Sequence, residues 1–131
     1  MSQPERIYAE PMINMETETY WQGTKDGKLM LKKCNACGET HFYPRAICPH
    51  CFSDDTGWYE ASGKGTIYTY SVMRRAEIPF VIAYVTLDEG VTMMTNIVEC
   101  DFDSVEVGQA VEVTFRPTEG DQALPVFRPA N

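Results

Sequence analysis

The sequence predicts a small, mainly β protein in which a short N-terminal helix and a cysteine-rich ribbon precede a barrel of five strands. Three observations support this fold class. Two C-x-x-C pairs lie in the first half of the chain, five short segments rich in β-branched and aromatic residues follow them, and turn signals separate those segments at roughly ten-residue intervals. Five such strands are typical of the OB-fold barrel, although an SH3-like barrel would give a similar pattern.

The N-terminal region is predicted to contain one helix. Residues 1–13 are largely polar and contain prolines, which indicates a loose arm. Asn14 can cap a helix over residues 15–22, whose early glutamates suit the positive end of the helix dipole. Gly23 can end that helix, and residues 28–33 then form a strand that leads into the first cysteine pair.

The barrel is predicted from strand-like segments in the second half of the chain. Residues 88–90 form a tight turn between the second and third segments, so these two are expected to pair as a hairpin. Pro125 and Pro129 favour an edge position for the last strand, because proline cannot donate a hydrogen bond to a neighbouring strand. The predicted strands are residues 66–73, 80–87, 91–98, 110–115 and 124–128.

The four paired cysteines predict a metal site. The C-x-x-C spacing lets both sulfurs of a pair face one ion, and two pairs complete a tetrahedral thiolate set, which favours structural zinc. Gly38 follows the first pair and can take the positive φ that such a turn often needs. Iron in a rubredoxin-type site and a redox dithiol are the alternatives. The predicted ligands are Cys34, Cys37, Cys48 and Cys51.

The charge distribution argues against a nucleic-acid or anionic-membrane ligand. The 131-residue chain has a formal net charge of −8, and an acidic surface repels phosphate backbones. From residue 52 onward, five basic residues stand against thirteen acidic ones, whereas residues 25–51 are locally basic and could meet a small anion. No stretch approaches the roughly 18 apolar residues of a membrane span and no signal peptide is evident, so we expect a cytoplasmic protein with reduced thiols.

No constellation of residues predicts catalysis by this chain alone. Four thiolates around one zinc ion leave no coordination position for water or substrate. Cys100 stands alone after a strand and is expected to be a half-buried or buried thiol rather than a nucleophile. His50 is expected to be exposed within the second cysteine pair, and His41 to orient the loop between the pairs. A self-contained hydrolase or acyltransferase would have to use Cys100.

The order of motifs resembles the DUF35 family. TYWQG precedes DGKLMLKKC and CNACGETHFYPRAICPHC, and SGKGTIYTYSV, PFVIAYVTLDEG, VGQAVEVTF and LPVFRP follow. The most specific features are FYPR ahead of CPHC and the apolar strand that ends in LDEG. The resemblance covers nearly the whole chain beyond the first dozen residues. It implies an N-terminal arm and helix over residues 1–29, a rubredoxin-like zinc ribbon over 30–58 and an OB-fold domain over 59–131.

The resemblance also implies a function. It indicates a non-catalytic, zinc-containing subunit of a thiolase-type acyl-CoA enzyme, with a heterotetramer, thiolysis of a β-oxoacyl-CoA and a shared CoA site as the corresponding expectations. Members of the family also accompany aldolases and MaoC-type hydratases, and serve as scaffolds between thiolase and hydroxymethylglutaryl-CoA synthase. A single-strand nucleic-acid-binding OB protein is the alternative that the acidic charge disfavours.

Four residues are candidates for contact with CoA. Arginine suits the phosphates of CoA and an aromatic ring suits its adenine. Two candidates lie on the ribbon loop and two at the end of the first barrel strand. They are Tyr43, Arg45, Arg74 and Arg75.

Overall fold

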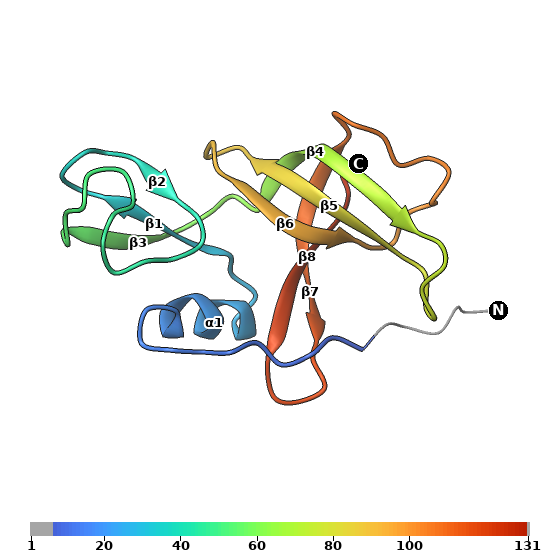
Figure 1. The fold of residues 1–131 in the computed structure, drawn as a ribbon, viewed down its shortest axis with the longest axis horizontal. Coiled ribbons are helices and arrows are strands. Elements are labelled where there is room, and N and C mark those ends of the chain that lie inside the picture. Colours follow the sequence, from blue (N-terminus) through green and yellow to red (C-terminus); the bar gives the residue numbers. More distant parts are fainter. Residues whose placement is uncertain (1–6, 131) are drawn as a thin grey trace.

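The computed structural model describes residues 7–130 as a three-stranded sheet and a closed five-stranded barrel, with one helix between them (Figure 1). The sheet has the strand order β2-β1-β3, and the barrel has the order β4-β5-β6-β8-β7. This architecture confirms the predicted mainly β class. The elements are α1 (Glu18–Lys25), β1 (Met30–Cys34), β2 (Thr40–His41), β3 (Thr56–Glu60), β4 (Lys64–Met73), β5 (Phe80–Leu87), β6 (Thr92–Ile97), β7 (Ala110–Pro117) and β8 (Ala123–Pro129).

The three-stranded sheet forms the ribbon, and the sequence predicts only its central strand. β1 pairs with the short β2 on one side, and on the other side it pairs with β3 along its whole length, from Met30–Glu60 to Cys34–Thr56. The residues of β3 are half-buried or exposed without alternation. No period-2 pattern therefore marks this strand in the sequence, and its conformation follows from pairing with β1.

The helix begins and ends three residues later than predicted. Asn14 stabilises the turn that precedes α1, where its side chain accepts a hydrogen bond from the backbone N–H two residues later at 3.0 Å. Gly23 lies inside α1 rather than ending it. A Cβ at this position would lie 2.6 Å from Cγ of Met30, so close packing of the helix on β1 explains the glycine. The glycine lets the helix approach β1 closely. The described part of the chain contains no helix that is both long and apolar enough to cross a bilayer.

The five barrel strands are the predicted ones, with ends that differ by at most two residues. Alternation along β5 points Val81, Val85 and Leu87 into the barrel, where each is buried. The predicted edge position of the last strand is wrong, because β8 lies between β6 and β7 and closes the barrel. The prolines of β8 are tolerated there because β8 shares only the pair Ile97–Phe127 with β6, so few ladder hydrogen bonds are needed on that side.

One buried apolar cluster joins the helix, the base of the ribbon and the barrel. Tyr20 and Trp21 on α1 belong to this cluster together with Leu29 and Leu31 at the base of the ribbon. Burial of side chains of this size contributes about 1.5–3 kcal/mol each. Among the described residues, no fully buried member of the cluster lies between Leu31 and Ala61. The part of the ribbon that carries the cysteines therefore needs another source of stability.

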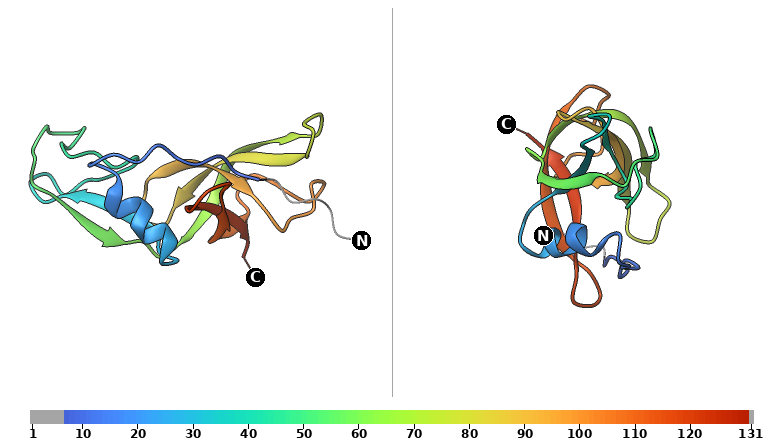
Figure 2. Two further views of the ribbon diagram at one scale, coloured as in Figure 1. Left: turned by 90° about the horizontal axis from the view of Figure 1, so that it is seen from below. Right: turned by 90° about the vertical axis from the view of Figure 1, so that its left-hand side faces the viewer.

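The described part of the N-terminal arm is held against the barrel. Residues 7–13 run along the barrel toward the ribbon (Figure 2). The carboxylate of Glu10 accepts hydrogen bonds from the backbone N–H groups of Gly120 and Gln122 at 3.2 and 3.3 Å. The prediction of a loose arm is therefore wrong for these residues, and residues 1–6 lie outside the described part of the chain.

Candidate functional site

The sulfurs of the four paired cysteines form one cluster. Their Sγ atoms all lie within 4.8 Å of one another. The distance from Cys34 to Cys51 is 3.6 Å, and that from Cys37 to Cys48 is 3.7 Å. Four sulfurs arranged tetrahedrally at about 2.3 Å from a zinc ion are separated by about 3.8 Å. The cluster therefore fits one zinc ion held by the predicted ligands.

The two C-x-x-C knuckles share one turn geometry. The backbone N–H of Gly38 donates to the carbonyl of Cys34 at 2.8 Å, and that of Phe52 donates to the carbonyl of Cys48 at 2.9 Å. Gly38 has a φ of +80°, as predicted, and Phe52 has a φ of +67°. A left-handed conformation costs an L-residue about 1–2 kcal/mol. The second knuckle thus holds an exposed phenylalanine in a conformation that glycine adopts without strain.

Backbone N–H groups of the knuckles point at the sulfurs. Cys37 donates to Sγ of Cys34 at 3.5 Å, and His50 donates to Sγ of Cys48 at 3.3 Å. The hydrogen bond from Cys37 is the main cause that lowers the pKa of Cys34 to about 7, whereas desolvation and the neighbouring sulfurs raise the pKa of Cys37 and Cys51 against the effect of their own backbone hydrogen bonds. Because the thiolate is the form that binds a metal, the knuckle backbone favours the charge state that a zinc ion requires.

A zinc ion in this cluster would be structural. Four thiolates complete its shell, and its binding free energy would stabilise the part of the ribbon that lacks a fully buried apolar core. His50 is exposed, as predicted. His41 is buried, and its Nε2 accepts a hydrogen bond from the backbone N–H of Arg45 at 3.3 Å, so it holds the loop between the knuckles.

The candidates for contact with CoA form two separate groups. The ribbon, with Tyr43 and Arg45, lies at one end of the molecule in Figure 1, whereas the β4–β5 connection, with Arg74 and Arg75, lies at the other end. Both arginines at positions 45 and 75 are exposed and have no ion-pair partner among the described residues. Within residues 7–130, each group therefore contains one arginine without an ion-pair partner.

The other two candidates are engaged within the chain. The hydroxyl of Tyr43 accepts a hydrogen bond from Nε1 of Trp21 at 2.9 Å, which ties the ribbon loop to α1. The guanidinium of Arg74 donates to Asp103 at 2.8 Å and lies over the ring of Phe102. Each of these side chains has a structural partner, so contact with a ligand would be an additional role.

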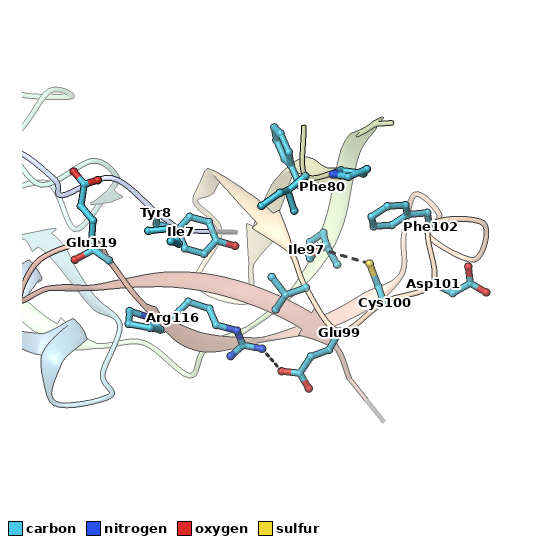
Figure 3. Close-up of a pocket in the computed structure, with 15 residues that line it drawn as sticks. Ile7, Tyr8, Phe80, Ile97, Glu99, Cys100, Asp101, Phe102, Arg116 and Glu119 are labelled. Carbon is cyan, nitrogen blue, oxygen red and sulfur yellow. Dashed lines mark hydrogen bonds and ion pairs between the residues drawn. The ribbon is translucent and has the colours of Figure 1, made fainter. Parts of the chain in front are cut away.

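A cleft of about 690 Å³ lies at the end of the barrel where the β4–β5 connection is found (Figure 3). Ile7 and Tyr8 of the arm form one wall. Phe80 and Ile97 come from the barrel strands, and Phe102 comes from the loop after β6. Small-molecule sites commonly have volumes of about 300–1,000 Å³ and mostly apolar walls, and this cleft has both properties.

The polar groups of the cleft do not form a nucleophilic centre. Arg116 donates to the carboxylate of Glu99 at 2.5 Å, and this hydrogen bond holds the pKa of Glu99 below its usual range. Burial raises the pKa of the half-buried Cys100 thiol, whose sulfur lies 3.6 Å from the carbonyl of Ile97. A thiol with a raised pKa is a weak nucleophile at neutral pH.

No local pattern in the sequence marks this cleft. Its walls come from the arm, the β4–β5 connection, the end of β6 and the end of β7, which are far apart in the chain. The available signal is the fold itself, because OB barrels commonly bind ligands beside the loops that follow their first and fourth strands.

Two family models match the chain in the order that the fold requires. Residues 21–57 match the model described as "ChsH2, rubredoxin-like zinc ribbon domain". Residues 58–116 match the model described as "ChsH2, C-terminal OB-fold domain". The second match identifies the five-stranded barrel as an OB-fold.

Two curated relatives are similar to this chain over most of its length. The chain is 34% identical to a probable enoyl-CoA hydratase alpha subunit of Thermomonospora curvata over 97% of its own length, but it spans only 41% of that protein. It is 41% identical to a DUF35 domain-containing scaffold protein of Methanothermobacter thermautotrophicus, over 70% of this chain and 76% of the relative.

A solved structure agrees in both fold and extent. It is described as "Ltp2-ChsH2(DUF35) aldolase", and one of its chains superposes with a TM-score of 0.83 at 35% identity, covering 93% of this chain and 100% of that one. The ribbon with four clustered cysteines, the OB barrel and these relatives lead to one assignment: the chain belongs to the DUF35 family.

Proposed function

We propose that this protein is a non-catalytic, zinc-containing subunit of a thiolase-type acyl-CoA enzyme. It stabilises the catalytic subunit and helps to bind the CoA part of a β-oxoacyl-CoA. The observation that carries the proposal is the superposition on the full length of one chain of an aldolase whose description names two components, Ltp2 and ChsH2. A chain that matches such a component from end to end suits the same accessory position, and a heterotetramer with two copies of each subunit is the expected assembly.

The chemistry of the chain supports this division of labour. The four clustered cysteines would complete the shell of a zinc ion and leave it no position at which to activate water. The thiol outside the cluster, Cys100, has a pKa raised by burial and by the neighbouring Asp101, and no histidine is among the residues that line the cleft. The catalytic groups would then come from the larger partner.

The reaction of the partner has named alternatives. One relative is called an enoyl-CoA hydratase alpha subunit, which supports an acyl-CoA substrate, and a solved neighbour is called an aldolase. Hydration of an enoyl-CoA and aldol cleavage are therefore the alternatives to thiolysis. All three reactions place a CoA thioester at the partner's active site, where Arg45 or Arg75 could contact a phosphate from a neighbouring surface.

Co-purification followed by reconstitution tests the proposal. The tagged chain is expressed in its native host, and the bound catalytic subunit is identified and then produced separately. We expect the mixture to convert a β-oxoacyl-CoA, a β-hydroxyacyl-CoA or an enoyl-CoA, the isolated chain to convert none, and the catalytic subunit alone to be less active or less stable. Turnover by the isolated chain, or identical activity with and without it, would contradict the proposal.

A further inference from the structure

Three consecutive strands of the barrel present an outer face with one charged residue, Lys64 at the start of β4. Residues 65–73, 80–87 and 92–97, in β4, β5 and β6, contain no Asp, Glu, Lys or Arg, whereas 23% of the whole chain is charged. Surfaces of small soluble domains commonly carry about 25–35% charged residues. Apart from Lys64, which begins β4 at one end of the face, these three paired strands carry no charge, so the face departs from an ordinary solvated surface.

Large apolar and aromatic side chains lie on this face. The strand register aligns Thr69, Tyr84 and Met94 in one row across the three strands. Tyr84 is 46% exposed and Met94 is 58% exposed. Tyr68, at the bulge in β4, is exposed as well. Tyrosine and methionine are enriched in the cores of protein–protein interfaces and charged residues are depleted there, which is the composition seen here.

A groove of about 360 Å³ opens onto the same face. Ile82 and Met94 line both the face and the groove, which continues toward Trp21 and Tyr43 where α1 meets the ribbon loop. Leu124 of β8 closes its other side. A nearly uncharged face beside an apolar groove provides both contact area and a pocket for an anchoring side chain.

The surroundings of the face specify the charge of its partner. The segments at the ends of these strands, residues 74–79, 88–91 and 98–103, carry six acidic and two basic residues. One of the two cations, Arg74, is in an ion pair with Asp103. The net field around the face is therefore negative, and a partner whose apolar patch is bordered by Lys and Arg would complement it.

Two other occupants fit this surface less well. The outer face of the second and third strands is where OB barrels bind oligonucleotides, but a phosphate backbone needs the cations that this face lacks. A second copy of the chain would bring together two molecules that each have a net charge of −8. Charge repulsion opposes that contact at low salt.

We infer that the outer face of β4, β5 and β6, with the adjoining groove, is the docking surface for a protein subunit whose apolar patch has a basic rim. This inference rests on the proposed function, and it adds the location and the chemistry of the contact. Met94 lies at the centre of the surface, because it belongs to both the uncharged row and the groove.

Binding measurements with the catalytic subunit identified by co-purification test the inference. Met94→Asp introduces a charge on an exposed outward position, and Val107→Asp, at a 65% exposed position in the loop before β7, is the matched control. We expect Met94→Asp to weaken binding about tenfold or more, with zinc content and thermal unfolding unchanged, and Val107→Asp to bind as wild type does. Binding by the wild type should weaken as salt rises, because the rim contacts are screened.

Each alternative gives a different result. Unchanged binding by both Met94→Asp and Tyr84→Thr would overturn the inference alone, because the complex would exist without this surface. Failure of the wild-type chain to bind any catalytic subunit would overturn the proposed function and the inference together. Dimerisation of the isolated chain in sedimentation, or binding of a labelled oligothymidylate, would also overturn the inference if Met94→Asp abolished it.

Discussion

The ribbon and the barrel reach stability by different physical means. The barrel encloses buried apolar residues such as Val81, Val85 and Phe127 within five paired strands. The ribbon has a three-stranded sheet with one two-residue strand, and four clustered cysteines. A small segment cannot bury enough apolar surface to fold alone, so metal binding substitutes for a core. The comparison predicts that each part responds to a different perturbation.

Loss of one zinc ligand should have the largest effect, and it should be confined to the ribbon. Structural zinc sites contribute about 10–16 kcal/mol of apparent binding free energy. We expect Cys48→Ser to lose zinc and to collapse the amide NMR signals of the ribbon, while barrel signals remain. Cys100→Ser is the matched control, because Cys100 lies outside the cluster. Retention of zinc and of the ribbon signals in Cys48→Ser would contradict the claim that zinc stabilises the ribbon.

A cavity in the barrel core should destabilise the barrel rather than the metal-binding part of the ribbon. Phe127 is fully buried and pairs with both β6 and β7. We expect Phe127→Ala to reduce the free energy of unfolding by about 3–5 kcal/mol in urea titrations followed by circular dichroism. Phe52→Ala removes the same side chain from a site that is 80% exposed, so it should change stability little. Equal effects of the two substitutions would show that burial does not stabilise the barrel.

The contact between helix and ribbon loop should have an intermediate effect. Tyr43→Phe removes the acceptor of the indole N–H of the buried Trp21 and leaves that donor unpaired. We expect a loss of about 1–2 kcal/mol in unfolding free energy, measured by urea titration with tryptophan fluorescence. Tyr68→Phe is the control, because Tyr68 is 67% exposed. If Tyr43→Phe and Tyr68→Phe unfold at the same urea concentration, the hydrogen bond does not join these two elements.

The two knuckles offer the smallest and most symmetrical test. Gly38 and Phe52 both have positive φ, and a Cβ at Gly38 would meet no atom within 4 Å. Gly38→Ala should therefore destabilise the ribbon through backbone strain alone, by about 1 kcal/mol, and Phe52→Gly should stabilise it by up to a similar amount. Thermal unfolding with zinc present measures both changes. The same sign for both substitutions would contradict this explanation.

Much of the fold was predictable because it depends on local patterns. Cysteine spacing predicts the knuckles, and the run of β-branched and aromatic residues over 80–87 predicts β5 to the residue. The predicted end of α1 was wrong because Gly23 does not end the helix. It is a glycine because the helix packs closely on Met30, a tertiary contact that the local sequence does not show. β3 was not predicted, because its five residues show no alternating pattern. They form a strand through their pairing with β1, which is again a tertiary contact.

The candidate sites divide in the same way. The metal ligands follow from spacing within the chain, so the sequence predicts all four. The cleft brings together the arm, the end of β6 and the end of β7, and its position depends on the anchor of Glu10 on the β7–β8 turn. The sequence gives no ion-pair partner for Arg74, whereas the fold brings Asp103 within hydrogen-bond distance of it. Long-range pairing of this kind leaves no local signal.

X-ray absorption at the zinc edge of the purified protein tests the central claim most directly. A saturated metal site is the reason to assign a supporting rather than a catalytic role to this chain. The account predicts four sulfur ligands at about 2.3 Å and no lighter ligand. Three sulfurs with one oxygen or nitrogen neighbour would contradict it, because such a shell leaves a position at which the metal could activate water.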